Sequence, residues 1–492
     1  MHNLNEIAGK ADEAIFSSNQ EEIEQLIQTL EKTLDDTISS DLECYTRYIL
    51  GNLYHRLSYI TAENPSNWRS DNYPDNLTIE INHLRQAKSL LSDKTSAIRN
   101  EIKTNLANAV SQQRRNIEVL SDWHHDFSAL SDAPYVSSLS KARELIWISH
   151  WLNDPSHQNL YRYEAYRLLS TLQENVDKSD HPKIKETLNT DRQIVSILEK
   201  GGNFFDGYED WQSLYNDVQY EPDEKNYRRW CLQNRLFANP INDLTTEWIA
   251  DQDILQFPNH IVSIGDGPYF LAAFSALKRE FCFARFMAFE GINGFHPEYE
   301  NKKLFLTNTL DYVHYDGAIE KIKAAYRICF SVFDSIAFLM NSYFECKSKH
   351  ISFSSRWIKD NFKNKDSNYF IDALYWLACD LTDNPDVTSN PEKWKAPNPH
   401  AAEIRKIRNA IEHGWLRVAE QDSRVWDKDS DFAYVITPQL LQERTLEVLK
   451  LARSAMLYLC MAVSYNESQN EKSEGLVVTS PVFMIDDEFM SF

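Results

Sequence analysis

Hydrophobic residues recur every three or four positions along most of this 492-residue chain. That spacing places them on one face of an α-helix, because a helix turns once every 3.6 residues. The chain has only 12 glycines and 16 prolines, which disfavours a turn-rich β architecture. The sequence therefore predicts an all-α protein, and its length allows two or three domains.

The N-terminal 200 residues show helical periodicity in one segment after another. The predicted helices cover residues 23–34, 45–60, 81–91, 98–110, 117–130, 139–152 and 160–172. The small residues of 104–110 resemble the first helix of a tetratricopeptide-like hairpin. We interpret residues 1–200 as a tetratricopeptide-like helical domain of the α-solenoid type, whose concave surface suits a protein partner or an activating trigger. An irregular helical bundle is the alternative.

Loop residues divide the rest of the chain. Gly201-Gly202 and Glu221-Pro222-Asp223 indicate loops, so we interpret 201–223 as a linker. Residues 224–300 are predicted to be a helical connecting region, 301–470 a helical bundle, and 471–492 an acidic tail. Long helices are expected over 318–346 and 438–465 within the bundle.

The predicted helix 403–413 carries the pair Arg408 and His413, with four residues between them. Such a pair could cleave RNA by attack of a ribose 2′-hydroxyl on the adjacent phosphate. Histidine exchanges protons near neutral pH, and arginine holds phosphate oxygens through its planar guanidinium. This scheme needs no metal, and the sequence contains no metal cluster and no cofactor motif. A solvated helix end is the alternative interpretation.

The spacing limits how the pair can act. Positions five residues apart lie about 140° apart on a regular helix, whereas Asn409 and His413 share a face. Either Arg408 reaches around the helix, or the two groups meet across a homodimer interface. Asp334 interrupts the apolar surface of helix 318–346, and a buried acid there needs a partner such as Arg405, Arg408 or His413. It either supports catalysis or only holds an arginine in place.

The charge balance restricts nucleic-acid contacts to a local patch. The formal net charge is −22, which repels phosphate in bulk. Residues 400–418 are instead slightly basic, and Arg405 and Lys406 are the candidates for substrate binding there. The seven cysteines form no CxxC pair, and the sequence predicts neither a signal peptide nor a membrane span. These features predict a cytoplasmic protein.

The Arg-Asn-Ala-Ile-Glu-His sequence of residues 408–413 resembles the RNA-cleaving signature of the HEPN superfamily. Further segments, 230–243, 277–286, 326–337 and 407–413, look like one bacterial HEPN family, which often carries tetratricopeptide-like helices ahead of its HEPN region. The resemblance covers about 222–470. The lysine that usually follows the helix aspartate in that family is Ser335 here.

The resemblance implies that 224–300 and 301–470 form a HEPN module that dimerises around a composite site. Arg408 and His413 would be catalytic, Asn409 and Glu412 would shape the site, and Asp334 would support it. The implied activity is a metal-independent endoribonuclease that acts as a toxin or an anti-phage effector. A catalytically silent scaffold that binds a protein or RNA, and a solenoid adaptor with a purely structural bundle, are the alternatives.

Overall fold

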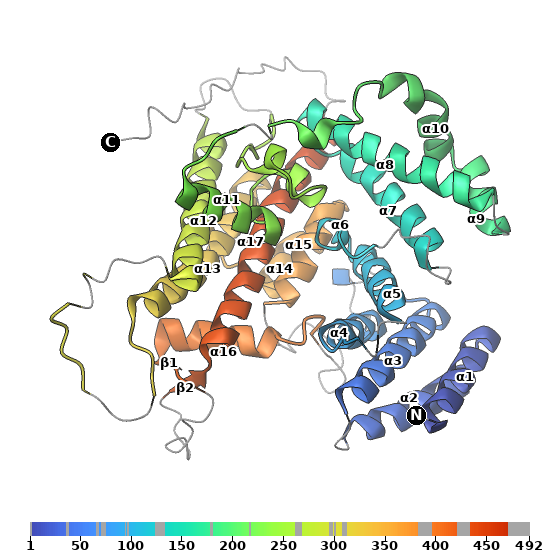
Figure 1. Cartoon of the computed structure of the whole chain (residues 1–492), viewed down its shortest axis with the longest axis horizontal. Helices are drawn as coiled ribbons and strands as arrows, with labels where there is room; N and C mark the ends of the chain where they lie inside the picture. Colours follow the sequence, from blue (N-terminus) through green and yellow to red (C-terminus); the bar gives the residue numbers. More distant parts are fainter. Residues whose placement is uncertain are drawn as a thin grey trace.

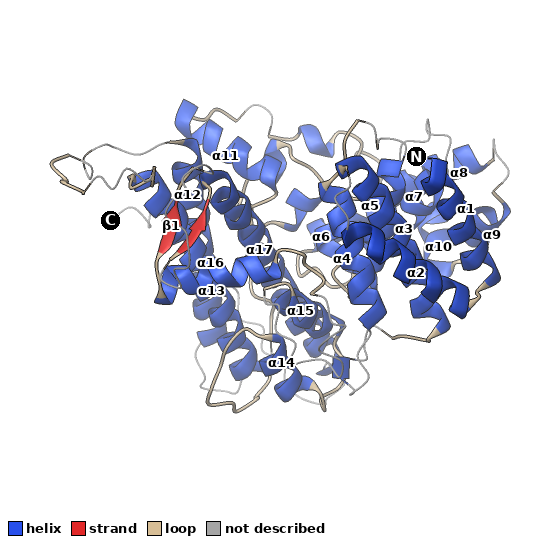
Figure 2. Ribbon diagram, turned by 90° about the horizontal axis from the view of Figure 1, so that it is seen from below, coloured by secondary structure: helices blue, strands red, loops and turns tan. Residues whose placement is uncertain are grey.

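The computed structural model describes residues 2–470 except 36–38, 65–67, 70–74, 94, 96–97, 124–132, 178–180, 216–217, 261–267, 295–298, 300–301, 308–311, 382–395 and 421–432. The predicted acidic tail, 471–492, lies outside the described residues. The described part contains seventeen α-helices and one two-stranded sheet (Figures 1 and 2), so the predicted all-α class is confirmed. None of the described helices is both long and apolar enough to cross a bilayer.

The helices of the N-terminal part are α1 (His2–Ser17), α2 (Gln20–Asp35), α3 (Ser40–Ile60), α4 (Asp75–Ser89), α5 (Arg99–Gln112), α6 (Asn116–Val119), α7 (Ala133–Ser149), α8 (Pro155–Val176), α9 (Pro182–Thr190) and α10 (Arg192–Phe204). Most successive helices pack on one another (Figure 1), as the predicted α-solenoid arrangement requires. The tetratricopeptide relationship itself stays a prediction.

The remaining elements are η3 (Trp211–Ser213), α11 (Pro222–Asn234), η4 (Pro240–Asp243), η5 (Trp248–Ala250), α12 (Tyr269–Asn293), α13 (Gly317–Tyr343), α14 (Ser355–Phe362), α15 (Tyr369–Cys379), α16 (Ala401–His413), β1 (Leu416–Val418), β2 (Tyr434–Ile436) and α17 (Pro438–Asn470). Helices α12, α13 and α17 pack along one another and form the centre of this bundle (Figure 1). The long helices predicted over 318–346 and 438–465 are confirmed as α13 and α17.

Two local predictions in the N-terminal part are wrong. Gly201-Gly202 lies inside α10 rather than in a loop. The ring of Tyr166 packs so closely on Gly201 that a Cβ there would collide with it, so this helical position requires glycine. Of the helix predicted over 117–130, residues 124–130 lie outside the described residues, and in the described part α6 ends at Val119 and a turn follows over 120–122. The side chains after that point face earlier helices: the carboxylate of Asp122 pairs with Lys88, and the indole N–H of Trp123 donates to Asn108.

One hydrophobic core joins the N-terminal helices to the bundle. It extends from Trp68 to Val463, while α1–α3 add a smaller cluster of their own. The ring of Trp68 stacks on Tyr375 of α15 with 4.3 Å between centroids. Burial of both rings removes apolar area from water on either side of the junction. The two parts of the chain are therefore packed together as one body.

Buried charges cross the same junction. Asp380, just after α15, accepts a hydrogen bond from Arg85 of α4 at 2.8 Å and from Arg115 at 2.5 Å. The side chains of Asp380 and Arg115 are at most 1% exposed, so each charge depends on the other for solvation. The carboxylates of Asp380 and Glu118 raise the pKa of Arg115 above its ordinary value, although its burial acts in the opposite direction.

We expect Asp380→Ala to destabilise the protein strongly, because it leaves the buried Arg115 guanidinium with one partner fewer. Glu118 still faces Arg115, so the loss in unfolding free energy should be about 3 kcal/mol, the low end for a broken buried pair. The control is Asp177→Ala, whose exposed pair with Lys185 spans 3.4 Å and is worth about 0–1 kcal/mol. Urea denaturation of both variants measures the difference, and equal losses would contradict a structural role for Asp380.

Candidate functional site on helix α16

Helix α16 ends where the sequence predicts and begins two residues before the predicted start. It ends at His413, and Gly414 follows as its C-terminal cap residue. Ile404 and Ile407 are fully buried, which fixes the face that α16 turns toward the core. Before the helix, the side chain of Asn398 donates to Glu447 of α17 at 2.7 Å. The start of the helix is thereby tied to α17.

Two contacts set the position of α16 across α13 (Figure 1). The buried hydroxyl of Tyr326 donates to the carbonyl oxygen of Ile404 at 2.8 Å. One residue further along α13, the Arg327 guanidinium donates to the carbonyl oxygen of Ile411 at 2.9 Å. The last carbonyl groups of a helix lack partners within the helix and carry partial negative charge, so a cation is stabilised there.

Arg408 lies on the side of α16 that faces α13. Its Nη2 is 3.8 Å from Oδ2 of Asp334, and its guanidinium carbon is 4.6 Å from the centroid of the Phe330 ring. The Arg408 side chain remains 43% exposed, so its guanidinium group is open to a ligand. The aromatic face and the carboxylate orient the guanidinium without covering it.

His413 and Asn409 lie on the opposite edge of the polar stripe. Both are exposed, and in the described part of the chain no hydrogen bond or ion pair engages either side chain. Glu412 lies between the two edges, and its carboxylate accepts from Nε of Arg327 at 3.1 Å. Arg405 and Lys406 are exposed one turn earlier on α16. The structure thus brings Asp334 to Arg408 but leaves His413 apart from both.

The description of Asp334 as a buried acid is wrong. Its side chain is 49% exposed. One carboxylate oxygen accepts from the backbone N–H of Phe353 at 3.1 Å, and the other faces Arg408. Asp334 therefore joins the loop before α14 to the site instead of neutralising a buried charge.

Sequence reasoning did not identify Arg327 and Phe330 as members of this site. Arg327 lies seven residues before Asp334, which places both on one stripe of α13. Phe330 fits the apolar pattern of the same helix, so nothing in the sequence separates it from the core residues. The seven-residue separation from Asp334 was the sequence feature that could have identified Arg327 as a site residue.

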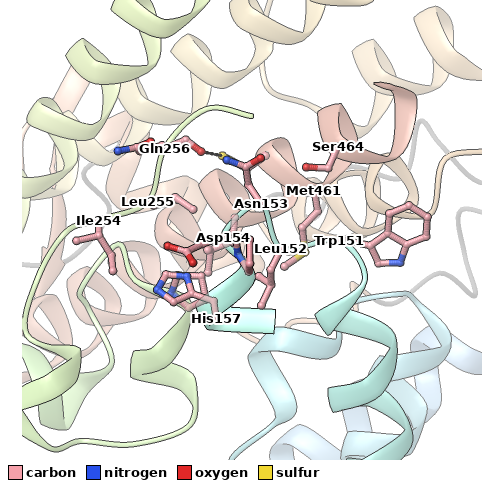
Figure 3. Close-up of a pocket in the computed structure, with 14 residues that line it drawn as sticks. Trp151, Leu152, Asn153, Asp154, His157, Ile254, Leu255, Gln256, Met461 and Ser464 are labelled. Carbon is pink, nitrogen blue, oxygen red and sulfur yellow. Dashed lines mark hydrogen bonds between the residues drawn. The ribbon is translucent and has the colours of Figure 1, made fainter. Parts of the chain in front are cut away.

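Two cavities are found among the described residues, and the smaller one adjoins α16. One of about 290 Å³ is bounded by Arg327, Lys323 and Trp415, at the C-terminal end of α16. A larger cavity of about 410 Å³ lies between the α7–α8 turn, the segment around Leu255 and α17 (Figure 3). Burial lowers the pKa of its His157, with Asp154 acting in the opposite direction. No residue of α13 or α16 lines the larger cavity, so it is separate from the Arg408 site.

The fold and this polar face define a helical bundle with an Arg-and-His motif on a late helix. Residues 261–466 match the family model described as LA2681-like HEPN, and this part of the chain is therefore a HEPN domain. The match spans α12 to most of α17 and contains every candidate site residue. Neither a curated protein nor a solved structure matches the chain.

We expect Asp334→Ala to leave the stability of the protein nearly unchanged. Its pair with Arg408 is half exposed and 3.8 Å long, so solvent screens it and its loss should cost about 0–1 kcal/mol. Urea denaturation gives the free energy of unfolding, with wild type as the reference. A loss of about 3 kcal/mol or more would mean that Asp334 holds the bundle together.

Proposed function

We propose that this HEPN domain is a metal-independent endoribonuclease. The observation that supports it best is the state of Arg408: its guanidinium is oriented by Phe330 and Asp334, yet open to solvent, on the helix that ends in the exposed His413. A cation placed to receive phosphate oxygens, with a proton carrier on the same stripe, is what cleavage by an internal hydroxyl requires.

In the proposed reaction, a ribose 2′-oxygen attacks the neighbouring phosphorus as its proton leaves to a base. The bond from phosphorus to the 5′-oxygen breaks, and that oxygen takes up a proton. His413 carries one or both protons, and Arg408 stabilises the negative charge on the phosphate oxygens. The products are a 2′,3′-cyclic phosphate and a 5′-hydroxyl. DNA, which has no 2′-hydroxyl, is not cut by this route.

A homodimer would complete the site. Arg408 and His413 lie about 140° apart around α16, so one helix presents them to opposite sides of a bound phosphate only with difficulty. The exposed stripe of α13 beside Arg408 includes the small Ser331 and the large apolar Phe338, which is 58% exposed. Such a surface suits the close approach of a second copy, whose His413 would then face this Arg408.

We further propose that the enzyme acts in the cytoplasm as a toxin or an anti-phage effector. The N-terminal helices would bind the protein partner or trigger that controls it, since stacked helical hairpins offer a surface for such contacts. In the alternative, a silent scaffold that binds a protein or RNA, the purified protein leaves RNA intact. Arg405 and Lys406, exposed on α16, would bind the RNA backbone in either case.

We expect His413→Ala to lower the rate of RNA cleavage about 10²–10⁴-fold, because it removes a proton carrier. Arg408→Lys should also lower the rate of RNA cleavage, since the point charge of an ammonium group does not replace the two parallel hydrogen bonds of a guanidinium. Cleavage by wild type should persist in EDTA. Matched controls are His350→Ala and Arg356→Lys, which change exposed residues outside α16 and should keep full activity.

The measurement is cleavage of total RNA, tRNA and mRNA by the five proteins, with the ends of the fragments mapped. Activity that needs Mg²⁺, or that survives in His413→Ala, would show that the site is elsewhere. RNA that stays intact with wild type, together with retained binding, would favour the scaffold.

Phe338→Asp tests the dimer. If the stripe of α13 is the interface, a buried unpaired carboxylate should shift the protein to monomer at micromolar concentration and abolish cleavage. Phe16→Asp is the control, because Phe16 is 93% exposed on α1 and its change should leave the dimer intact. Sedimentation velocity measures the assembly state. A wild-type monomer with full nuclease activity would contradict the composite site.

A further inference from the structure

The larger cavity, shown in Figure 3, lies where the N-terminal helices meet the HEPN domain and measures about 410 Å³. Small-molecule sites usually measure about 300–1,000 Å³, so this cavity has room for a small ligand. Three separate parts of the chain line it: the α7–α8 turn with the start of α8, the segment between α11 and α12, and the second half of α17. A ligand bound there would contact both parts of the molecule.

Hydrogen bonds hold these three parts in place around the cavity. The hydroxyl of Tyr161, on α8, donates to the carbonyl oxygen of Pro240 at 2.8 Å. The thiol of Cys460, on α17, donates to the carbonyl oxygen of Gln256 at 3.5 Å. The first contact joins α8 to η4, and the second joins α17 to the segment before α12. The walls of the cavity are therefore fixed by the fold, as a binding site requires.

His157 lines the cavity with a polar side chain that the described protein does not satisfy. Only 6% of the residue is exposed, and among the described residues no hydrogen bond engages its ring. Burial lowers the pKa of His157, so the imidazole is neutral near pH 7 and offers one N–H donor and one acceptor nitrogen. A buried polar group without a protein partner destabilises the fold unless a ligand or an ordered water satisfies it.

Asp154 lies beside His157 at the exposed rim of the cavity (Figure 3). Its Oδ1 accepts from the backbone N–H of Ser156 at 2.7 Å and so caps α8. Its Oδ2 takes part in no hydrogen bond or ion pair with any residue that the structure describes. An ionised carboxylate only accepts hydrogen bonds, so this oxygen suits a hydroxyl group, as acidic residues bind ribose hydroxyls in dinucleotide sites.

The lining also limits the charge of a ligand. No lysine or arginine is among the described residues that line the cavity. Lys278 of α12, a cation beside this segment, instead donates to the carbonyl oxygens of Asp253 and Leu255 at 3.1 and 2.9 Å. A phosphate would therefore have no cation to pair with, and an ammonium group would meet only the exposed Asp154. The lining thus favours an uncharged ligand.

We propose that this cavity binds a nucleoside, which is a base and a sugar without phosphate. Such a ligand has apolar ring faces, a base edge with donors and acceptors, and sugar hydroxyls. The buried side chains of Leu152, Leu255 and Met461 would cover the ring faces. His157 would bond the base edge, and Asp154 would accept from the sugar. A bound nucleoside would link the α7–α8 turn to α17 of the HEPN domain.

The test measures binding of adenosine, guanosine, cytidine and uridine by isothermal titration calorimetry, independently of nuclease activity. We expect wild type to bind at least one of them, and His157→Leu to bind it at least about tenfold more weakly, because leucine has no donor or acceptor. Without nucleoside, His157→Leu should melt at the same temperature as wild type or higher, since no hydrogen bond to a described residue is lost. A purely structural histidine would lower it.

Two matched controls and a second variant accompany this test. His350→Leu makes the same change at an exposed position outside the lining and should bind like wild type. Asp154→Asn keeps the cap of α8, because asparagine caps a helix as well as aspartate does, but it should weaken binding. Asp191→Asn makes that change at the cap of α10 and should not. Unchanged affinity in both His157→Leu and Asp154→Asn would overturn the proposal.

A competition experiment on wild type tests the proposal even if a variant does not fold. The 5′-monophosphate should need at least about a tenfold higher concentration than the nucleoside itself to displace the labelled nucleoside, because the lining offers a carboxylate and no cation. Displacement is measured so that phosphate bound at the Arg408 site is not counted. Stronger displacement by the monophosphate would overturn the proposal. So would the absence of nucleoside binding, which would mean that water alone satisfies His157.

Discussion

The hydrogen bond from Tyr326 to the carbonyl oxygen of Ile404 sets where α16 crosses α13. A buried phenol must find a partner, and here the carbonyl oxygen of Ile404 provides it, so sliding α16 would leave a polar group unsatisfied. Arg327 adds a second point at the end of α16. With both contacts made, Arg408 reaches Asp334 and Phe330, and the polar stripe of α16 faces outward.

The junction between the N-terminal helices and the bundle uses buried charge in a different way. Asp372 accepts from the indole of Trp68 at 3.1 Å and from Arg69 at 2.6 Å, and its burial raises its pKa, with Arg69 acting in the opposite direction. Buried ion pairs add little net stability, but they penalise every arrangement in which one partner is missing. They therefore specify how the helices dock, while the shared apolar core supplies the free energy.

The sequence was informative where a helix packs along its whole length. The limits of α13, α16 and α17 follow from a 3.6-residue apolar pattern and from residues such as Pro438 and Gly414 at the ends. Periodicity reports which face of a helix is apolar, but not whether a neighbour covers its polar edge. That is why the exposure of Asp334 could not be predicted, although the motif on α16 could.

The remaining differences come from contacts distant in sequence. Gly201 reads as a loop residue until Tyr166 is placed against it. Strands β1 and β2 have three residues each, too few for an alternating pattern, and they exist because Leu416–Val418 pairs in parallel with Tyr434–Ile436. Arg327 lies in a segment that the family resemblance includes, but its place beside Glu412 depends on the crossing of two helices. Each of these requires the tertiary arrangement first.

The polar residues differ in burial and in hydrogen bonding, and this difference supports the proposed site. Tyr326, Arg115 and Arg453 are buried and hydrogen-bonded, and so is one carboxylate oxygen of Asp380, so folding depends on these side chains. Arg408 makes only weak, half-exposed contacts, and His413 makes none that the described residues record. An exposed Arg and His, held on a helix whose position is fixed so firmly, have the rigid support and the open face that phosphate chemistry needs.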